Sequence, residues 1–238
     1  MKDILDMHTH TIASGHAYST IREMAEAARI KKLQLLGITE HAPTMPGTCH
    51  EMYFRNFKVI DRTAYGVEIL LGSELNIMDF FGNIDLSVNV LKKIDYTIAS
   101  LHDQCLNPGS LEQNTTAVIK AMQNPYVTII GHPDDGHFAL DYKAIAKAAK
   151  DANVLIELNS SSLRPGSHRL NARENITCLL NYCKHYETSI VVNSDAHIDL
   201  DVGNHRLAHE LLAELNFPET LIVNTAVDKF KNYLTSHN

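Results

Sequence analysis

The segment Ile4-Leu5-Asp6-Met7-His8-Thr9-His10 indicates the fold, because a short apolar run passes directly into two histidines. We interpret it as a buried strand that ends in a His-x-His pair. Comparable apolar runs predict six further strands over 35–39, 68–75, 96–101, 127–131, 154–159 and 189–193. Their nearly continuous apolar character is typical of strands that are covered on both faces.

Helical patterns separate these strands. We expect helices over 20–32, 54–65, 87–93, 111–123, 142–152, 172–186, 204–215 and 227–234. We also expect Ser19 to cap the first helix and a short extra strand over 221–224. Strands that alternate with helices predict a parallel sheet with helical crossovers. About seven such units predict a single α/β domain over 1–238 that forms a β/α barrel, with an open doubly wound sheet as the alternative.

Composition narrows the functional classes. The formal net charge of −7 argues against nucleic acid as a partner, because broad nucleic-acid binding needs a basic surface. No apolar run approaches the ~20 residues that span a bilayer, and the first six residues carry acids where a signal peptide carries basic and apolar residues. We therefore expect a cytoplasmic protein without a membrane partner. The four scattered cysteines form no C-x-x-C pair, which predicts reduced thiols.

Fourteen histidines are the anomaly of this composition. Seven of them, with one Glu and one Asp, lie at or just past the C-terminal ends of six predicted strands. They are His8, His10, His16, His41, Glu74, His102, His132, Asp195 and His197. Residues i and i+2 of a strand share a face, so Asp6, His8 and His10 are expected to point the same way. In a β/α barrel such strand ends converge on one rim.

Metal ions explain this convergence better than chance does. Clustered imidazoles repel one another when protonated and leave lone pairs unmet when neutral. Divalent ions resolve both problems, and nine nitrogen and oxygen ligands suit two or three ions rather than one. The other histidines are expected at the surface or in loops, with His137 and His168 on the same rim. These are His50, His137, His168, His185, His205, His209 and His237.

The order of these residues resembles the PHP (polymerase and histidinol phosphatase) superfamily, and above all its small YcdX-type phosphatases. The matching motifs are His8-x-His10, Thr39-Glu40-His41, Gly72-x-Glu74, His102, His132-Pro133 and Ser194-Asp195-x-His197. The resemblance covers essentially the whole chain. It implies a distorted seven-stranded β/α (TIM-like) barrel with its metal site at the C-terminal rim of the strands. It also implies three divalent ions per chain, most often zinc, while manganese or iron suit the same ligands.

The resemblance also implies how the ligands are shared. One ion would take His8, His10, Glu74 and Asp195. A second would share Glu74 and take His102 and His132. A third would take His16, His41 and His197. This chain has Thr-Glu-His where the family usually has Thr-Asp-His, so we expect Glu40 to alter the support around an intact site.

The expected reaction is hydrolysis of a phosphate monoester on a small phosphorylated substrate, by a metal-bridging hydroxide. Three dipositive ions and two carboxylates leave the site at about +4, which attracts phosphate despite the charge of the whole chain. Asp195 and Glu74 are the expected catalytic residues. Arg173 is the expected substrate-binding residue, with Arg164 and Arg169 as weaker candidates.

Other functions stay open. A PHP-type phosphodiesterase or exonuclease would use the same ligands, although no basic groove accompanies them here. An amidohydrolase also begins with His-x-His, but it usually has a modified lysine or a glutamate on strand four, where this chain has Ser100-Leu101-His102. A non-enzymatic metal-binding module would be expected to have lost ligands. A homo-oligomer is suggested by analogy alone.

Overall fold

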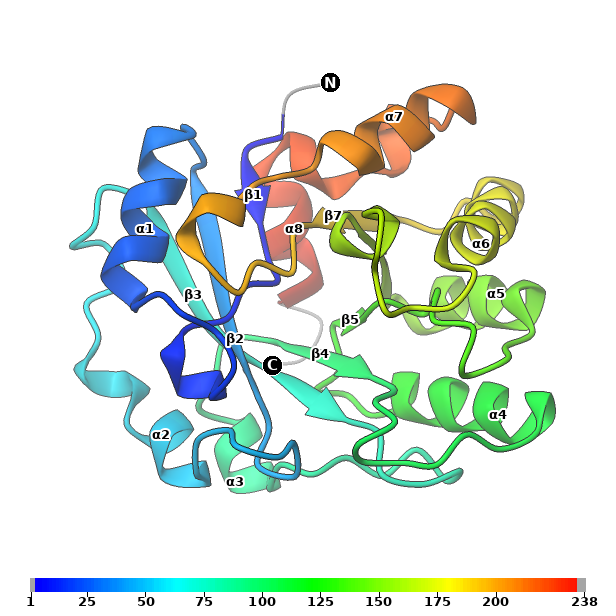
Figure 1. Cartoon of the computed structure of the whole chain (residues 1–238), viewed down its shortest axis with the longest axis horizontal. Helices are drawn as coiled ribbons and strands as arrows, with labels where there is room; N and C mark the ends of the chain where they lie inside the picture. The colour runs from blue at the N-terminus through cyan, green and yellow to red at the C-terminus, as the bar shows by residue number, and fades with distance from the viewer. Residues whose placement is uncertain (1–2, 235–238) are drawn as a thin grey trace.

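Seven parallel strands form one sheet in the order of the chain in the computed structural model, which describes residues 3–234. They are β1 (Leu5–Asp6), β2 (Leu35–His41), β3 (Glu68–Asn76), β4 (Thr97–Ser100), β5 (Ile129–Ile130), β6 (Leu155–Asn159) and β7 (Ile190–Asn193). The sheet curls into a nearly closed barrel with helices around it (Figure 1). The predicted β/α barrel is thus confirmed, because a doubly wound sheet would reverse its strand order at a switch point.

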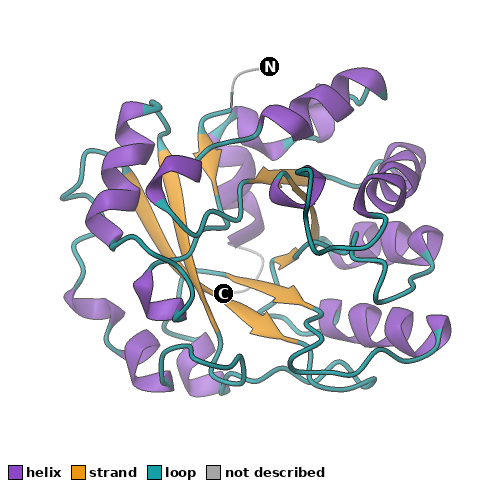
Figure 2. Cartoon of the chain, in the orientation of Figure 1, coloured by secondary structure: helices purple, strands orange, loops and turns teal. Residues whose placement is uncertain are grey.

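Eight α-helices lie between or after the strands in the described part of the chain. They are α1 (Ile21–Ile30), α2 (Glu51–Arg55), α3 (Val88–Leu91), α4 (Leu111–Met122), α5 (Tyr142–Ala152), α6 (Ala172–Tyr186), α7 (Arg206–Glu214) and α8 (Val227–Leu234). Most of them cover the outside of the sheet (Figure 2). None of the helices within residues 3–234 has both the length and the apolar character needed to cross a membrane.

Three local predictions were wrong. The N-cap of α1 is Thr20, whose side chain and Glu23 form a reciprocal capping box, while the Ser19 hydroxyl bonds Asp199 instead. In place of the expected helix over 54–65, the chain has the end of α2 at Arg55 and a 3₁₀ turn over Phe57–Val59. Each of these short elements buries one phenylalanine, Phe54 and Phe57. The expected strand over 221–224 is a pair of 3₁₀ turns joined to β7 by one isolated bridge.

The interior of the barrel has an apolar end and a polar end. Inward-facing residues near the start of the strands form one apolar cluster, which α8 covers with Phe230. Tyr96 crosses this cluster and donates a hydrogen bond to the Met7 carbonyl at 2.6 Å. A Cβ at position 37 would come within 1.9 Å of the Tyr96 hydroxyl, so Gly37 is required there. Further along the strands, Glu74 and other buried polar residues face the opposite end.

Side chains close the barrel between β1 and β7, a boundary we call the seam. In the described chain these strands form no ladder, and the segments that follow them meet through an isolated Thr9–Ala196 bridge. The Asn193 side chain accepts from the Met7 backbone amide at 2.9 Å, and Asn224 bridges Leu5 and Val192. The buried backbone groups that a ladder would pair are thereby satisfied by polar side chains.

Candidate metal centre

All nine predicted ligands come together at the C-terminal rim of the strands. Seven of them line a cavity of about 540 Å³ that opens to the surface. These seven are His16, His41, Glu74, His102, His132, Asp195 and His197. His8 and His10 lie directly beneath and are fully buried. The sequence therefore predicted correctly which strand ends meet.

Two carboxylate oxygens, from Glu74 and Asp195, lie close to the inner nitrogens of His8 and His10. His8 Nε2 lies 3.1 Å from His10 Nε2, 3.3 Å from Glu74 Oε2 and 3.6 Å from Asp195 Oδ1. His10 Nε2 is 3.4 Å from both of these carboxylate oxygens. Zinc bonds of about 2.0–2.2 Å to His and carboxylate ligands would set such atoms roughly 3.3–3.6 Å apart. This group matches the first ion that the family resemblance implies.

Glu74 faces two sets of histidines with its two oxygens. Oε2 lies 2.8 Å from His41 Nδ1 and within 3.4 Å of the inner nitrogens of His8 and His10. Oε1 lies 2.8 Å from His132 Nε2 and 3.3 Å from His102 Nε2. The Ser100 hydroxyl donates to Oε1 at 2.7 Å and holds this orientation. The carboxylate is therefore oriented to bridge two ions.

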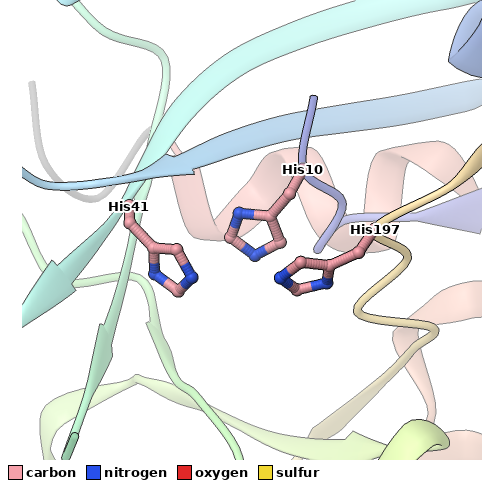
Figure 3. Close-up of side chains that lie close together, drawn as sticks. All are labelled: His10, His41 and His197. Carbon is pink, nitrogen blue, oxygen red and sulfur yellow. The ribbon is translucent and has the colours of Figure 1, made fainter. Parts of the chain in front are cut away.

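A third group of imidazoles lies on the side of the site that is open to solvent. His16 Nε2 is 3.1 Å from His197 Nε2, and the His16 ring stacks on that of His41 at a centroid distance of 4.9 Å. The rings of His10, His41 and His197 turn toward one another from three separate segments (Figure 3). Their ligand nitrogens lie within 4.8 Å of one another. Because His10 Nδ1 bonds Ser14 and its Nε2 has one lone pair, His10 can serve this group or the first one, but not both.

The outer nitrogens of two rings are hydrogen-bonded, which directs their inner nitrogens into the site. His8 Nδ1 donates to Glu157 at 2.7 Å, and His10 Nδ1 donates to the Ser14 hydroxyl at 3.0 Å. In neutral rings the two Nε2 lone pairs would then face each other at 3.1 Å. His41 Nδ1 and Glu74 Oε2 are buried and 2.8 Å apart, yet neither makes a well-directed hydrogen bond within the described structure. Divalent ions fit these residues.

The ionisation of the two carboxylates and of His10 suits metal binding. His8 differs, because burial lowers its pKa but Glu157, Glu74 and Asp195 raise it well above its usual value. Burial raises the pKa of the Glu74 and Asp195 carboxyls, but the positive potential of neighbouring histidines, His8 above all, outweighs it and holds both well below their usual range. Burial, together with His41 and His197, lowers the pKa of His10 well below its usual value. Ionised carboxylates and a neutral imidazole are the forms that bind metals.

Glu157 supports the site and was missed in the sequence. It lies at the centre of β6 and is fully buried. Its carboxylate accepts from His8 Nδ1, from the His132 backbone amide at 2.7 Å and from the Asn193 side chain at 2.8 Å. A carboxylate that accepts from the outer nitrogen of a ligating histidine fixes its ring orientation. The sequence feature that could have revealed Glu157 is a single charged residue within the predicted buried strand over 154–159.

Glu40 has the supporting role that its position beside His41 predicted. Its carboxylate accepts from the Thr11 hydroxyl and amide and from the Ser14 hydroxyl at 2.5 Å. Ser14 in turn accepts from His10, so Glu40 orients that ring through one intermediate residue. Asn76 orients His102 directly, because its amide oxygen lies 2.7 Å from His102 Nδ1.

Two of the ligands have a strained backbone. His132 has a φ of 26° and Asp195 a φ of 53°, in the left-handed region that side chains rarely adopt. Such conformations cost about 1–3 kcal/mol each and persist where surrounding contacts enforce them. The Glu157 bond to the His132 amide is one such contact. The strain turns both side chains into the site.

The structure places the predicted arginines differently from one another. Arg173 lies on the surface, pairs with Glu214 at 2.5 Å and is not part of the cavity wall, which does not support the predicted contact with substrate. Arg169 and Arg164 both line the cavity. Arg169 donates to Asp195 Oδ2 at 3.0 Å and has a side chain only 8% exposed. Arg164 bonds Asp201 through Nη1, while its buried Nη2 has no partner within residues 3–234.

The remaining predictions for this rim had mixed outcomes. His168 lines the cavity, whereas His137 is exposed and bonds Asp135. The Asp6 side chain does not share a face with His8 and His10, because β1 ends at Asp6 and the strand alternation of side chains ends with it. Its carboxylate accepts hydrogen bonds from the backbone amides of Ser194 and Gly203. Of the other histidines, His205 is buried rather than at the surface, and His237 lies outside the described residues.

Comparisons with known sequences and structures agree with this geometry. The family model described as PHP domain matches residues 6–228. A "Probable phosphatase" of Clostridium novyi is 43% identical over 236 residues, which is 99% of this chain and 96% of that protein. A "Probable phosphatase" of Caldanaerobacter subterraneus is 49% identical over 235 residues, covering 97% of this chain and 91% of the relative.

One solved structure is similar in fold. It is histidinol phosphate phosphatase from Lactococcus lactis, crystallised with zinc, L-histidinol and phosphate. The two folds match with a TM-score of 0.62 over 91% of this chain and 95% of the other, at 17% identity. At that identity the likeness establishes the architecture alone.

Proposed function

Because this chain belongs to the PHP domain family, we propose that it is a metal-dependent phosphatase acting on small phosphate monoesters. The names of its relatives support a phosphoric ester hydrolase. We further propose three divalent ions at the rim, with zinc as the native metal and manganese or iron as alternatives. The ligand sets are those that the family resemblance implies.

The observation that carries this proposal is the orientation of Glu74. One of its oxygens faces His8 and His10, and the other faces His132 and His102. A carboxylate with ligands on both sides could hold two ions, and paired ions are used by enzymes that displace groups at phosphorus. When bound, the ions would supply an activated water and offset the charge of the phosphoryl oxygens.

The protein's own residues then orient the substrate. Arg164 has a buried guanidinium nitrogen without a partner in the described structure, on the cavity wall. Arg169 lies on the same wall and holds Asp195 in place. Two guanidinium groups near an anion site suit a phosphate, because their paired donors match its oxygens. We assign substrate binding to this pair in place of Arg173.

The test compares a monoester and a diester on the same preparation. Protein purified without chelator and loaded with zinc or manganese is assayed with p-nitrophenyl phosphate and with bis-p-nitrophenyl phosphate. We expect the monoester to be hydrolysed much faster, and activity to disappear with EDTA and return with metal. A fully metallated protein that cleaves neither ester would refute phosphatase activity, and one that prefers the diester would assign it to the phosphodiesterase class.

A further inference from the structure

A second group of metal-type side chains lies at the seam, outside the rim. Asp3 precedes β1, while His205 and His209 lie one turn apart at the start of α7. Asp3 Oδ2 is 2.7 Å from His205 Nδ1 and 2.7 Å from His209 Nε2. The three ligand atoms lie within 4.8 Å of one another. We call these residues the seam cluster.

The hydrogen bonds of the seam cluster are incomplete. Asp3 Oδ1 and His205 Nε2 are both buried, and neither has a hydrogen-bond partner in the described part of the chain. Burial opposes a charged His205, yet its bonds to Asp3 and Asp6 raise its pKa to about 9. His205 Nδ1 and His209 Nε2 both reach the same oxygen, Asp3 Oδ2, so Asp3 Oδ1 is left without a partner among the described residues. Buried polar atoms without partners are rare and call for an explanation.

A divalent ion accounts for these atoms. We propose that Asp3, His205 and His209 bind one zinc-type metal ion that ties the N-terminal segment to α7 across the seam. Two imidazoles and a carboxylate are ligands that zinc accepts in tetrahedral sites, with water as the fourth. Asp3 can use its unpaired oxygen toward the ion as well. The ligand atoms need to separate from 2.7 Å to roughly 3.3 Å.

The surroundings favour this assignment. Asp6 Oδ1 lies 3.6 Å from His205 Nε2, on the side of the ring away from Asp3. A ligating histidine typically donates its other nitrogen to a carboxylate, which Asp6 can supply after a small shift. Two cations border the same pocket, but both are engaged elsewhere: Lys31 bonds the Leu200 carbonyl, and Arg206 pairs with Glu210.

The charges also balance. Asp3 and Asp6 bring two carboxylates into a buried region, beside His205 and His209. A dipositive ion with two neutral imidazoles offsets the charge of both carboxylates. Because Asp6 also accepts from Ser194, which precedes the rim ligand Asp195, the ion would stabilise the segment that carries that ligand.

Metal content distinguishes the seam ion from those at the rim. His209→Gln removes one seam ligand, and His185→Gln is the matched control, because His185 is exposed on α6 and belongs to neither cluster. After saturation with zinc and gel filtration, we expect the wild type and His185→Gln to hold one ion per chain more than His209→Gln. Equal metal content in all three proteins would overturn the proposal, and hydrogen bonds from a protonated His205 would then account for the cluster without a metal ion.

A second measurement separates this test from the proposed function. In Glu74→Gln, which is designed to empty the rim, zinc should still raise the melting temperature by several degrees. The same addition should have no effect on the double variant with His209→Gln. A zinc response of equal size in both would overturn the seam site, whatever the rim binds. Asp3→Asn should abolish the response as His209→Gln does.

Discussion

The rim and the seam use the same kinds of ligands but differ in what surrounds them. At the rim, Glu74 faces histidines on both sides, and a cavity of about 540 Å³ opens above them with arginines on its wall. At the seam, Asp3 faces two histidines beneath a pocket of about 220 Å³ whose cations are already paired. Metal ligands alone therefore do not make a catalytic site. A carboxylate that faces histidines on both sides, a larger cavity and an arginine nitrogen without a partner in the described residues distinguish the rim.

The two regions also differ in how firmly their ligands are held. Rim ligands follow inward-facing ends of several strands, and Glu157 fixes two of them from the barrel interior. Seam ligands come from a segment before β1 and from the first turn of a helix. We expect changes at the rim to alter catalysis strongly, and changes at the seam to alter stability.

Glu74→Gln should have the largest effect. The neutral amide cannot offset two neighbouring ions, so metal content should fall together with activity, by about 10³-fold or more for the latter. Steady-state kinetics on an aryl phosphate and elemental analysis of the same sample measure both. A variant that keeps its ions and its activity would contradict a bridging role for Glu74.

Glu157→Gln should have the next largest effect. Its amide can no longer accept from both His8 and the His132 backbone as an ionised carboxylate does, so the rings lose their fixed orientation. Loss of such a supporting carboxylate typically lowers metal affinity or activity by about 10–100-fold. Competition with a chelator measures the affinity, and excess metal should restore much of the activity. An unchanged affinity would show that Glu157 serves folding alone.

Glu74 and Glu157 show which residues of the site can be predicted from the sequence alone and which cannot. Glu74 was predictable because it ends a strand whose neighbours also end in ligands, and parallel strands bring such ends together. Glu157 was not, since strand periodicity does not reveal that a buried charge has partners from β1 and from the loop after β5. Register between distant segments decides such contacts.

The same limit explains the other corrections. The seam cluster joins Asp3 and His205, which are 202 residues apart, through a closure that no local pattern encodes. Arg173 was predicted from its position after β6, but it lies on the outer surface of α6. The helix over 54–65 was overestimated because two buried phenylalanines at helical spacing also fit two short turns.

Arg164→Met should have a smaller effect that is confined to substrate binding. Losing a charged hydrogen bond to phosphate is worth about 1.5–3 kcal/mol, so kcat/KM should fall by about tenfold or more. Metal content should not change, because Arg164 bonds Asp201 rather than any predicted ligand. Arg173→Met is the matched control and should match the wild type. Equal losses in both variants would argue against a specific phosphate contact.

His209→Gln should have the smallest effect on catalysis. His209 does not line the rim cavity, so we expect kcat/KM within about twofold of the wild type at 25 °C, while the melting temperature in zinc falls. Kinetics and thermal unfolding of one preparation test both parts. A loss of activity as large as that of Glu157→Gln would mean that the seam acts directly on the rim.

The number of ions at the rim tests the central claim most directly. Elemental analysis of zinc-loaded His209→Gln counts rim ions alone, because this variant lacks the seam site. We predict three ions per chain, with phosphatase activity that rises and falls with their number during stepwise removal. Fewer than two ions per chain in fully active protein would contradict a bridged metal centre built on Glu74.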